Sequence, residues 1–128
     1  MVPHVRGADA YRRVEAQSRS PLELVIMLYD GALRFLTDAR TAAAAKDLAG
    51  RSRGVTKTLA IVGELQSTLN VAQGGSVAAE LDRLYTYVTG RLLDVSLKQD
   101  AAAIDEVYKL LSTVRDGWVQ VAGQGTRP

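Results

Sequence analysis

The sequence predicts an all-α protein: an antiparallel up-down four-helix bundle with an additional short N-terminal helix. Proline occurs only at positions 3, 21 and 128, so no proline interrupts the chain from 22 to 127. Across that stretch the apolar residues recur at intervals of three and four, the period of one face of an α-helix. The connections are short, so consecutive long helices should be antiparallel. We expect one short helix and four longer ones, near residues 8–18, 21–45, 48–70, 76–98 and 100–122.

The helix near 21–45 carries the clearest start signal. Ser20 can cap its first turn, Pro21 suits that turn, and Glu23 completes a capping box. Asp47 and Asp100 can cap the helices that follow them. These residues predict where three of the long helices begin.

Glycines mark the remaining boundaries. Gly74 and Gly75 predict a flexible turn, with Ser76 as the cap of the next helix. Gly123 and Gly125 predict the end of the last helix.

Two further glycines fall inside the helix near 48–70. Gly50 and Gly54 each weaken a helix by about 1 kcal/mol relative to alanine. They either allow a neighbouring backbone to come close or leave the first turns frayed. The sequence leaves both explanations open.

Three of the long helices each carry one apolar stripe, which we expect to face the core. The stripes are Leu48, Val55, Leu59, Val62, Leu65 and Leu69; Val77, Leu81, Leu84, Tyr85, Val88, Leu92 and Val95; and Ile104, Val107, Tyr108, Leu111, Val114, Trp118 and Val121.

The helix near 21–45 has more apolar surface than one core stripe requires. Its two adjacent stripes span roughly 200° of the helix, against the roughly 100° of a core-facing stripe. The second stripe is therefore available to a partner, and we take its members Leu24, Leu28 and Phe35 as candidate binding residues. The first stripe, which can build the core, is Leu22, Val25, Ile26, Tyr29, Ala32, Leu33, Leu36 and Ala39.

The helix near 76–98 also carries apolar residues outside its stripe. Leu93 and Leu97 lie in line with small or weakly polar residues, and Tyr87 lies on the other flank. Such a line can form a shallow groove for another helix, so Tyr87, Leu93 and Leu97 are also candidate binding residues. The small or weakly polar residues are Ala79, Thr86 and Gly90.

A purely structural explanation of the surplus is equally open. A bundle helix that contacts two neighbours also needs a wide apolar face. The N-terminal helix around Tyr11 and Val14 could cover the surplus within the same chain. A general helical adaptor, or a homo-oligomeric bundle that buries the surplus against itself, would show the same pattern.

Composition limits the class of protein. The 128 residues predict a single domain, 1–128, with flexible tails at 1–7 and 123–128. The net charge is only +2 and the charges are scattered, so a nucleic-acid partner is not expected. The chain has no cysteine, no secretory signal and no apolar run long enough to span a bilayer. We expect a cytoplasmic protein without membrane insertion.

Residues with catalytic or metal-binding chemistry are scarce. The single histidine is His4, and the chain has no Glu-x-x-His pair of the di-iron bundle kind. No histidine is placed to activate a serine, and no cysteine is present to act as a nucleophile. We therefore expect neither an enzyme nor a metal or cofactor site.

Five segments in order resemble the flagellin-specific export chaperones, the FliS family. They cover roughly residues 11–120, and five matches at family-like spacing are far more specific than one motif. In the first segment, Arg19 stands where the family usually has alanine. The segments are Ser18-Arg19-Ser20-Pro21-Leu22-Glu23-Leu24, similar to T-A-S-P-x-E-L; Met27-Leu28-Tyr29-Asp30-Gly31-Ala32, identical to M-L-Y-D-G-A; Lys57 with Ile61-Val62-Gly63-Glu64-Leu65, similar to K-A-x-x-I-I-x-E-L; Gly74-Gly75 with Leu81 and Leu84-Tyr85-Thr86-Tyr87, similar to G-G…L-x-x-L-Y-x-Y; and Arg115-Asp116-Gly117-Trp118, similar to R-x-x-W.

The resemblance implies a cytoplasmic, non-enzymatic chaperone. Members of the family bind the disordered C-terminal segment of flagellin, prevent premature polymerisation and deliver flagellin to the flagellar type III export apparatus. An N-terminal segment of the family covers part of the binding surface when the client is absent. That role would fall here to Tyr11, with Val14 beside it. We expect a monomer or weak dimer.

Overall fold

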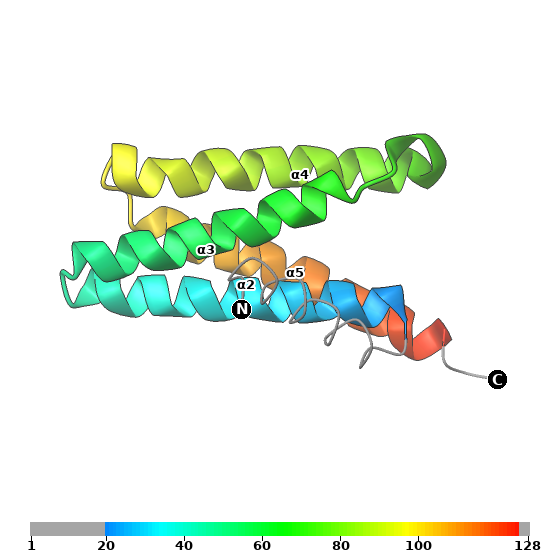
Figure 1. Ribbon diagram of the computed structural model, residues 1–128, viewed down its shortest axis with the longest axis horizontal. Coiled ribbons are helices and arrows are strands. Elements are labelled where there is room, and N and C mark those ends of the chain that lie inside the picture. Colours follow the sequence, from blue (N-terminus) through cyan, green and yellow to red (C-terminus); the bar gives the residue numbers. More distant parts are fainter. Residues whose placement is uncertain (1–19, 126–128) are drawn as a thin grey trace, which may run out of the picture.

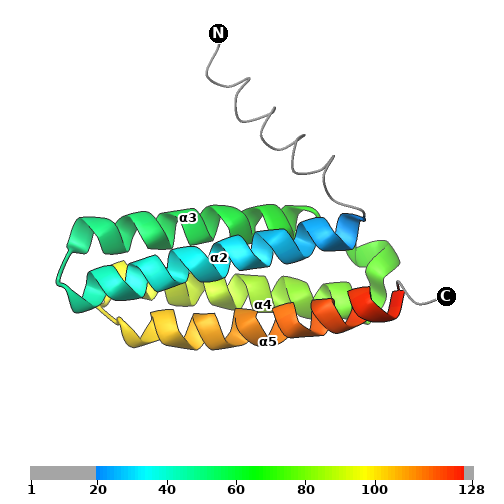
Figure 2. The same cartoon turned by 90° about the horizontal axis from the view of Figure 1, so that it is seen from below.

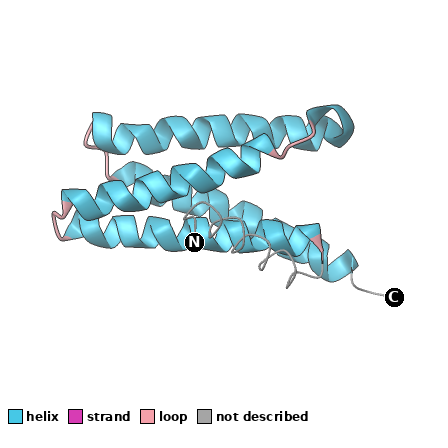
Figure 3. Ribbon diagram, in the orientation of Figure 1, coloured by secondary structure: helices cyan, strands magenta, loops and turns pink. Residues whose placement is uncertain are grey.

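The computed structural model describes residues 20–125, which form four long α-helices and no strand, as Figures 1 and 3 show. The predicted all-α bundle is therefore confirmed. The expected helix at 8–18 lies outside the described residues. The four helices are α2 (Pro21–Ala44), α3 (Leu48–Ser67), α4 (Val71–Leu97) and α5 (Ala102–Gly125).

The four helices stand at the corners of a bundle, and consecutive helices are antiparallel (Figure 2). α2 contacts α3 and α5, and α4 contacts the same two helices. α2 and α4 therefore lie diagonally across the core from one another.

Side-chain caps start α2 and α3 as the sequence predicts. Ser20 Oγ accepts a hydrogen bond from the backbone N–H of Glu23 at 3.2 Å, and Asp47 Oδ1 accepts one from Gly50 at 3.0 Å. Asp100 was expected to cap the helix that follows it. Its carboxylate instead forms an ion pair with Arg91.

The start of α4 differs from the expectation. The helix begins at Val71 instead of residue 76, and the expected turn is a kink inside it. Gly75 makes the kink with φ 59° and ψ −136°, a left-handed conformation that favours glycine. α5 also continues to Gly125, three residues beyond its expected end.

Each helix contributes its stripe to one continuous core. Three residues expected in these stripes are nevertheless exposed: Leu48, Val77 and Val121. Each lies near an end of its helix, where less of the neighbouring helices covers it. The buried core residues are Tyr29, Ala32, Leu36, Ala39, Val55, Val62, Leu65, Ala78, Tyr85, Val88, Leu92, Val95, Ala103, Ile104, Val107 and Leu111.

Gly54 allows α2 and α3 to approach closely. A Cβ atom at this position would lie 2.7 Å from the carbonyl oxygen of Phe35 and 2.8 Å from the Cβ of Ala39. A Cβ atom in a real structure does not come this close to other heavy atoms, so only glycine fits here without a shift of the helices. Of the two explanations left open, close backbone approach applies to Gly54.

We predict that Gly54→Ala lowers the free energy of unfolding by about 1–3 kcal/mol, because α2 and α3 must move apart. Urea denaturation followed by circular dichroism measures the change. Gly63→Ala is the matched control in the same helix, because a Cβ there meets no atom within 4 Å. Helix propensity should raise its stability by up to about 1 kcal/mol. Equal effects at the two positions would contradict the close-approach argument.

Candidate protein-binding surface

α4 exposes more large apolar surface than a core helix requires. Leu93 is 46% exposed, Leu97 78% and Tyr87 49%. Val77 near the start of the helix is exposed as well. Three of the six predicted binding residues are thus on the surface of α4.

These three residues lie on two different sides of α4. Leu93 follows Thr86 by seven residues, so both lie on the same side of the helix. Gln66 Nε2 of α3 donates a hydrogen bond to the Thr86 hydroxyl at 3.0 Å, which places this side towards α3. Tyr87 instead donates its hydroxyl proton to Glu106 of α5. Leu93 and Leu97 therefore flank α3, whereas Tyr87 flanks α5.

Leu48 is a surface residue that the sequence assigned to the core. It is 59% exposed. It precedes Gln66 by 18 residues, or five full helical turns, so it lies on the side of α3 that faces α4. One feature of the sequence could have indicated this exposure: Leu48 is the first residue of α3, where the core stripe ends.

We call Leu48, Leu93 and Leu97 the α3–α4 surface. Gly90 lies three residues before Leu93 in α4, Gly63 lies 15 residues after Leu48 in α3, and both glycines are exposed. A Cβ on either glycine would meet no atom within 4 Å, so space is open above the backbone. Exposed leucines on helices that also have open space above the backbone are suited to the apolar face of another helix.

The three predicted residues of α2 are half-buried instead of exposed. Leu28 packs against the core. Phe35 has the Lys57 ammonium of α3 5.3 Å from its ring centroid. Gly31 lies between them, and a Cβ there would be 3.3 Å from Ile61 of α3. The stripe of Leu24, Leu28 and Phe35 therefore faces α3.

The wide apolar face of α2 follows from its two neighbours, α3 and α5. This is the structural alternative that the sequence left open. Since α2 and α4 are diagonal, their candidate residues do not share one site. Leu24, Leu28 and Phe35 lie on one side of α3, and Leu93 and Leu97 lie on the other. Tyr11 and Val14 lie outside the described residues.

A separate apolar cavity of about 430 Å³ opens at one end of the bundle. All four helices contribute to it: the start of α2, the end of α3, the start of α4 and the end of α5. Apolar side chains predominate in its lining. The lining residues are Val25, Leu65, Thr68, Leu69, Asn70, Gly74, Val77, Ala78, Leu81, Tyr85 and Trp118.

Two tyrosines meet in the core beside this cavity. The hydroxyls of Tyr29 in α2 and Tyr85 in α4 are 2.5 Å apart. Burial raises the pKa of both phenols, so both stay protonated at neutral pH. The nearby Trp118 indole acts in the opposite direction on the pKa of Tyr29, although it forms no hydrogen bond of normal geometry. The pair therefore joins the two diagonal helices by one buried hydrogen bond.

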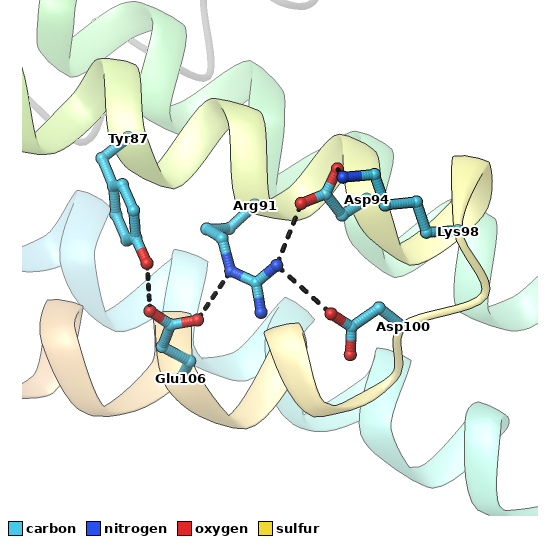
Figure 4. A network of polar contacts seen from close by, with 6 residues as sticks. All are labelled: Tyr87, Arg91, Asp94, Lys98, Asp100 and Glu106. Carbon is cyan, nitrogen blue, oxygen red and sulfur yellow. Dashed lines mark hydrogen bonds and ion pairs between the residues drawn. The ribbon is translucent and has the colours of Figure 1, made fainter.

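Arg91 organises a polar network that fixes the second half of α4 to α5 (Figure 4). Its Nε lies 2.6 Å from Glu106, and its Nη1 lies 2.9 Å from Asp94 and 3.2 Å from Asp100. The hydrogen bond with Tyr87, then the one with Arg91, lowers the pKa of Glu106. Tyr87 is thereby held on the α5 side of α4.

The part of the chain that the structure describes contains no cluster of three metal-binding side chains. Between residues 20 and 125, no helix combines the length and apolar character needed to cross a membrane.

Comparison with known proteins identifies the family. The family model described as "Flagellar protein FliS" matches residues 5–125. The chain belongs to the FliS family. This is a family of chaperones and not of enzymes.

Several relatives match over most of both chains. A flagellar secretion chaperone FliS of Salmonella typhimurium is 36% identical over 121 residues, 91% of this chain and 90% of the relative. The flagellar secretion chaperone FliSB of Pseudomonas aeruginosa is 35% identical over 118 residues, covering 89% and 94%. The FliS of Campylobacter jejuni is 35% identical over 118 residues, covering 92% of each chain.

The segments that carry the FliS resemblance meet in the structure. Tyr29 bonds to Tyr85, and Arg115 Nε lies 2.7 Å from Asp30 Oδ1. Trp118 lies near the Tyr29 hydroxyl. These motif residues come from α2, α4 and α5 and hold those helices together. The motifs that resemble the FliS family therefore include residues that connect the helices of the bundle to one another.

We predict that Tyr29→Phe and Tyr85→Phe each lower the free energy of unfolding by about 1–3 kcal/mol, because each leaves a buried hydroxyl without its partner. The double variant has no orphaned hydroxyl, so it should be less destabilised than the sum of the two. Urea denaturation of the wild type, the two single variants and the double variant gives the four free energies of unfolding for this double-mutant cycle. Additive losses would show that the two hydroxyls are not coupled.

Proposed function

We propose that this chain is a cytoplasmic export chaperone that binds the disordered C-terminal segment of flagellin. Binding prevents premature polymerisation and aids delivery to the flagellar type III export apparatus. Membership of the FliS family and relatives named flagellar secretion chaperones support this role. The structural observation that carries the proposal is the α3–α4 surface, whose three leucines are exposed.

A disordered client suits this kind of surface. The client segment forms helices on binding, so its apolar faces cover the exposed leucines while ordering entropy tempers the affinity. Leu93 and Leu97 receive one client helix at the α3–α4 surface. The accessible parts of Leu24, Leu28 and Phe35 on the other side of α3, and Tyr87 near α5, bind further parts of a segment that wraps around the bundle.

The N-terminal segment supplies a cover in the absence of client. In this proposal Tyr11 and Val14 occupy part of the apolar binding surface and leave when the client arrives. Competition of this kind protects exposed apolar surface from aggregation and costs some client affinity.

We predict that Leu93→Asp weakens binding of a flagellin C-terminal peptide at least tenfold, because a carboxylate must be desolvated where the client helix packs. Leu28→Asp should also weaken binding. Isothermal titration calorimetry measures the dissociation constants. Circular dichroism melting checks that both bundles still fold, which matters most for Leu28 because it packs against the core.

Val119→Asp is the matched control, because Val119 is an exposed apolar residue of α5 outside all the candidate residues. It should bind the peptide like the wild type. Wild-type affinity in both folded test variants would overturn the assigned surfaces.

The alternative function is a helical adaptor or homo-oligomer that buries the same leucines against a second copy. Sedimentation equilibrium at several concentrations separates the two functions. A monomer or weak dimer that gains helicity with the peptide supports the chaperone. A tight dimer that Leu93→Asp dissociates, with no peptide binding, supports the alternative.

A further inference from the structure

The two halves of α4 are held in the bundle differently. Side-chain hydrogen bonds to other helices begin at Asp82, whose carboxylate accepts one from Gln66 of α3 at 2.9 Å, and the Arg91 network follows further along. Between Gly74 and Leu81, no side chain forms a hydrogen bond or ion pair with another helix of the described structure. The start of α4 therefore lacks the directional contacts that fix the rest of the helix.

The core stripe of α4 also becomes less buried towards its start. Val88 and Leu92 are fully buried, Leu81 and Leu84 are half-buried, and Val77 is 60% exposed. A segment with few buried apolar contacts can open locally at a lower free energy than the whole domain. We therefore expect the first turns of α4 to be the part of this helix that opens most easily.

Two glycines shape the beginning of this segment. Gly75 has φ 59° and ψ −136°, a backbone conformation that favours glycine. A Cβ atom on Gly74 would lie 2.6 Å from the Cβ of Ala78, so this glycine lies directly against Ala78. The Gly74 N–H donates a hydrogen bond to the carbonyl oxygen of Asn70 at 2.7 Å. The first turn of α4, Val71–Gly74, is thus a separate unit beyond the kink.

This turn forms part of the wall of the end cavity. Gly74, Val77 and Ala78 all line the cavity. Ala78 is only 6% exposed, and Gly74 lies against it. Figures 1 and 2 show that α4 starts at the end of the bundle where α2 begins and α5 ends. The first turn of α4 therefore covers one side of an otherwise open apolar cavity.

We propose that the first turn of α4, Val71–Gly74, is a lid on the end cavity that moves about Gly75 while the rest of the bundle stays folded. This conformational device goes beyond the proposed function and does not depend on it. The open lid exposes Ala78 and widens the cavity mouth, and the closed lid covers that side. Access of an apolar group to the covered side is then limited by the fraction of molecules whose lid is open.

Native-state hydrogen exchange of the full wild-type chain tests whether the turn moves alone. The Gly74 amide reports on the lid, and the amides of Val88 and Leu92 report on unfolding of the bundle. We expect the Gly74 amide to be protected but to exchange at least about a hundredfold faster than the two core amides. Urea should hardly change its rate, because local opening exposes little surface.

Two results of this measurement would overturn the proposal. A Gly74 amide that exchanges with the same free energy and urea dependence as Leu92 opens only when the whole bundle unfolds. A Gly74 amide without any protection belongs to a turn that never closes.

Two variants test whether the turn covers the cavity. Trp118 is the reporter, because it lines the cavity and is the only tryptophan in the chain. Gly75→Ala strains the hinge, and Gly74→Ala places a Cβ against Ala78, so the two variants displace the lid in different ways. We expect about tenfold faster exchange of the Gly74 amide in Gly75→Ala. Acrylamide should quench Trp118 fluorescence more strongly in both variants than in the wild type.

Gly90→Ala is the matched control in the same helix. A Cβ there meets no atom within 4 Å, and the φ of Gly90 is not positive. This variant should keep the wild-type exchange and quenching, and circular dichroism melting checks that all three variants fold. Unchanged Trp118 quenching in folded Gly75→Ala and Gly74→Ala overturns the proposal, because the turn then does not cover the cavity. An equal rise in quenching in Gly90→Ala overturns it as well.

Discussion

The hydrogen bond between Tyr29 and Tyr85 joins helices that stand diagonally across the bundle. Both hydroxyls are buried, so each must be paired or its burial costs about 1–3 kcal/mol. This requirement fixes the register of α2 relative to α4 through the centre of the core. Asp30 follows Tyr29 in α2, and its ion pair with Arg115 connects α5 to the same part of α2. The arrangement of all the surfaces depends on this register.

Different kinds of interaction hold the four pairs of neighbouring helices together. Glycine packing brings α2 and α3 so close that side chains are nearly excluded at Gly54. α2 and α5 are held by ion pairs, one between Arg40 and Asp105 and one between Asp30 and Arg115. α4 is held to α5 chiefly through the Arg91 network, and to α3 through hydrogen bonds of Gln66.

This division explains why α4 can expose leucines without leaving the bundle. Its buried stripe and the directional polar contacts near its second half hold it in place. The side chains of Leu93 and Leu97 are 46% and 78% exposed, so they add little to the core. The function that we propose, binding of a disordered segment, requires such a surface on a scaffold that keeps its shape before and after release.

The sequence by itself determined the helical period, the caps at Ser20 and Asp47, and the core stripes, because these depend on contacts within one helix and on burial of one face. It also predicted the exposed leucines of α4, since residues outside a stripe have no place in a core. It could not assign Leu24, Leu28 and Phe35, because an apolar face looks the same whether a partner or α3 covers it. Only the tertiary structure decided that α2 and α4 are diagonal, that Leu48 extends beyond the core, and that Trp118 lies near the buried Tyr29 hydroxyl. These facts depend on how the helices are arranged around one another, and the apolar period of a single helix carries no information about that arrangement.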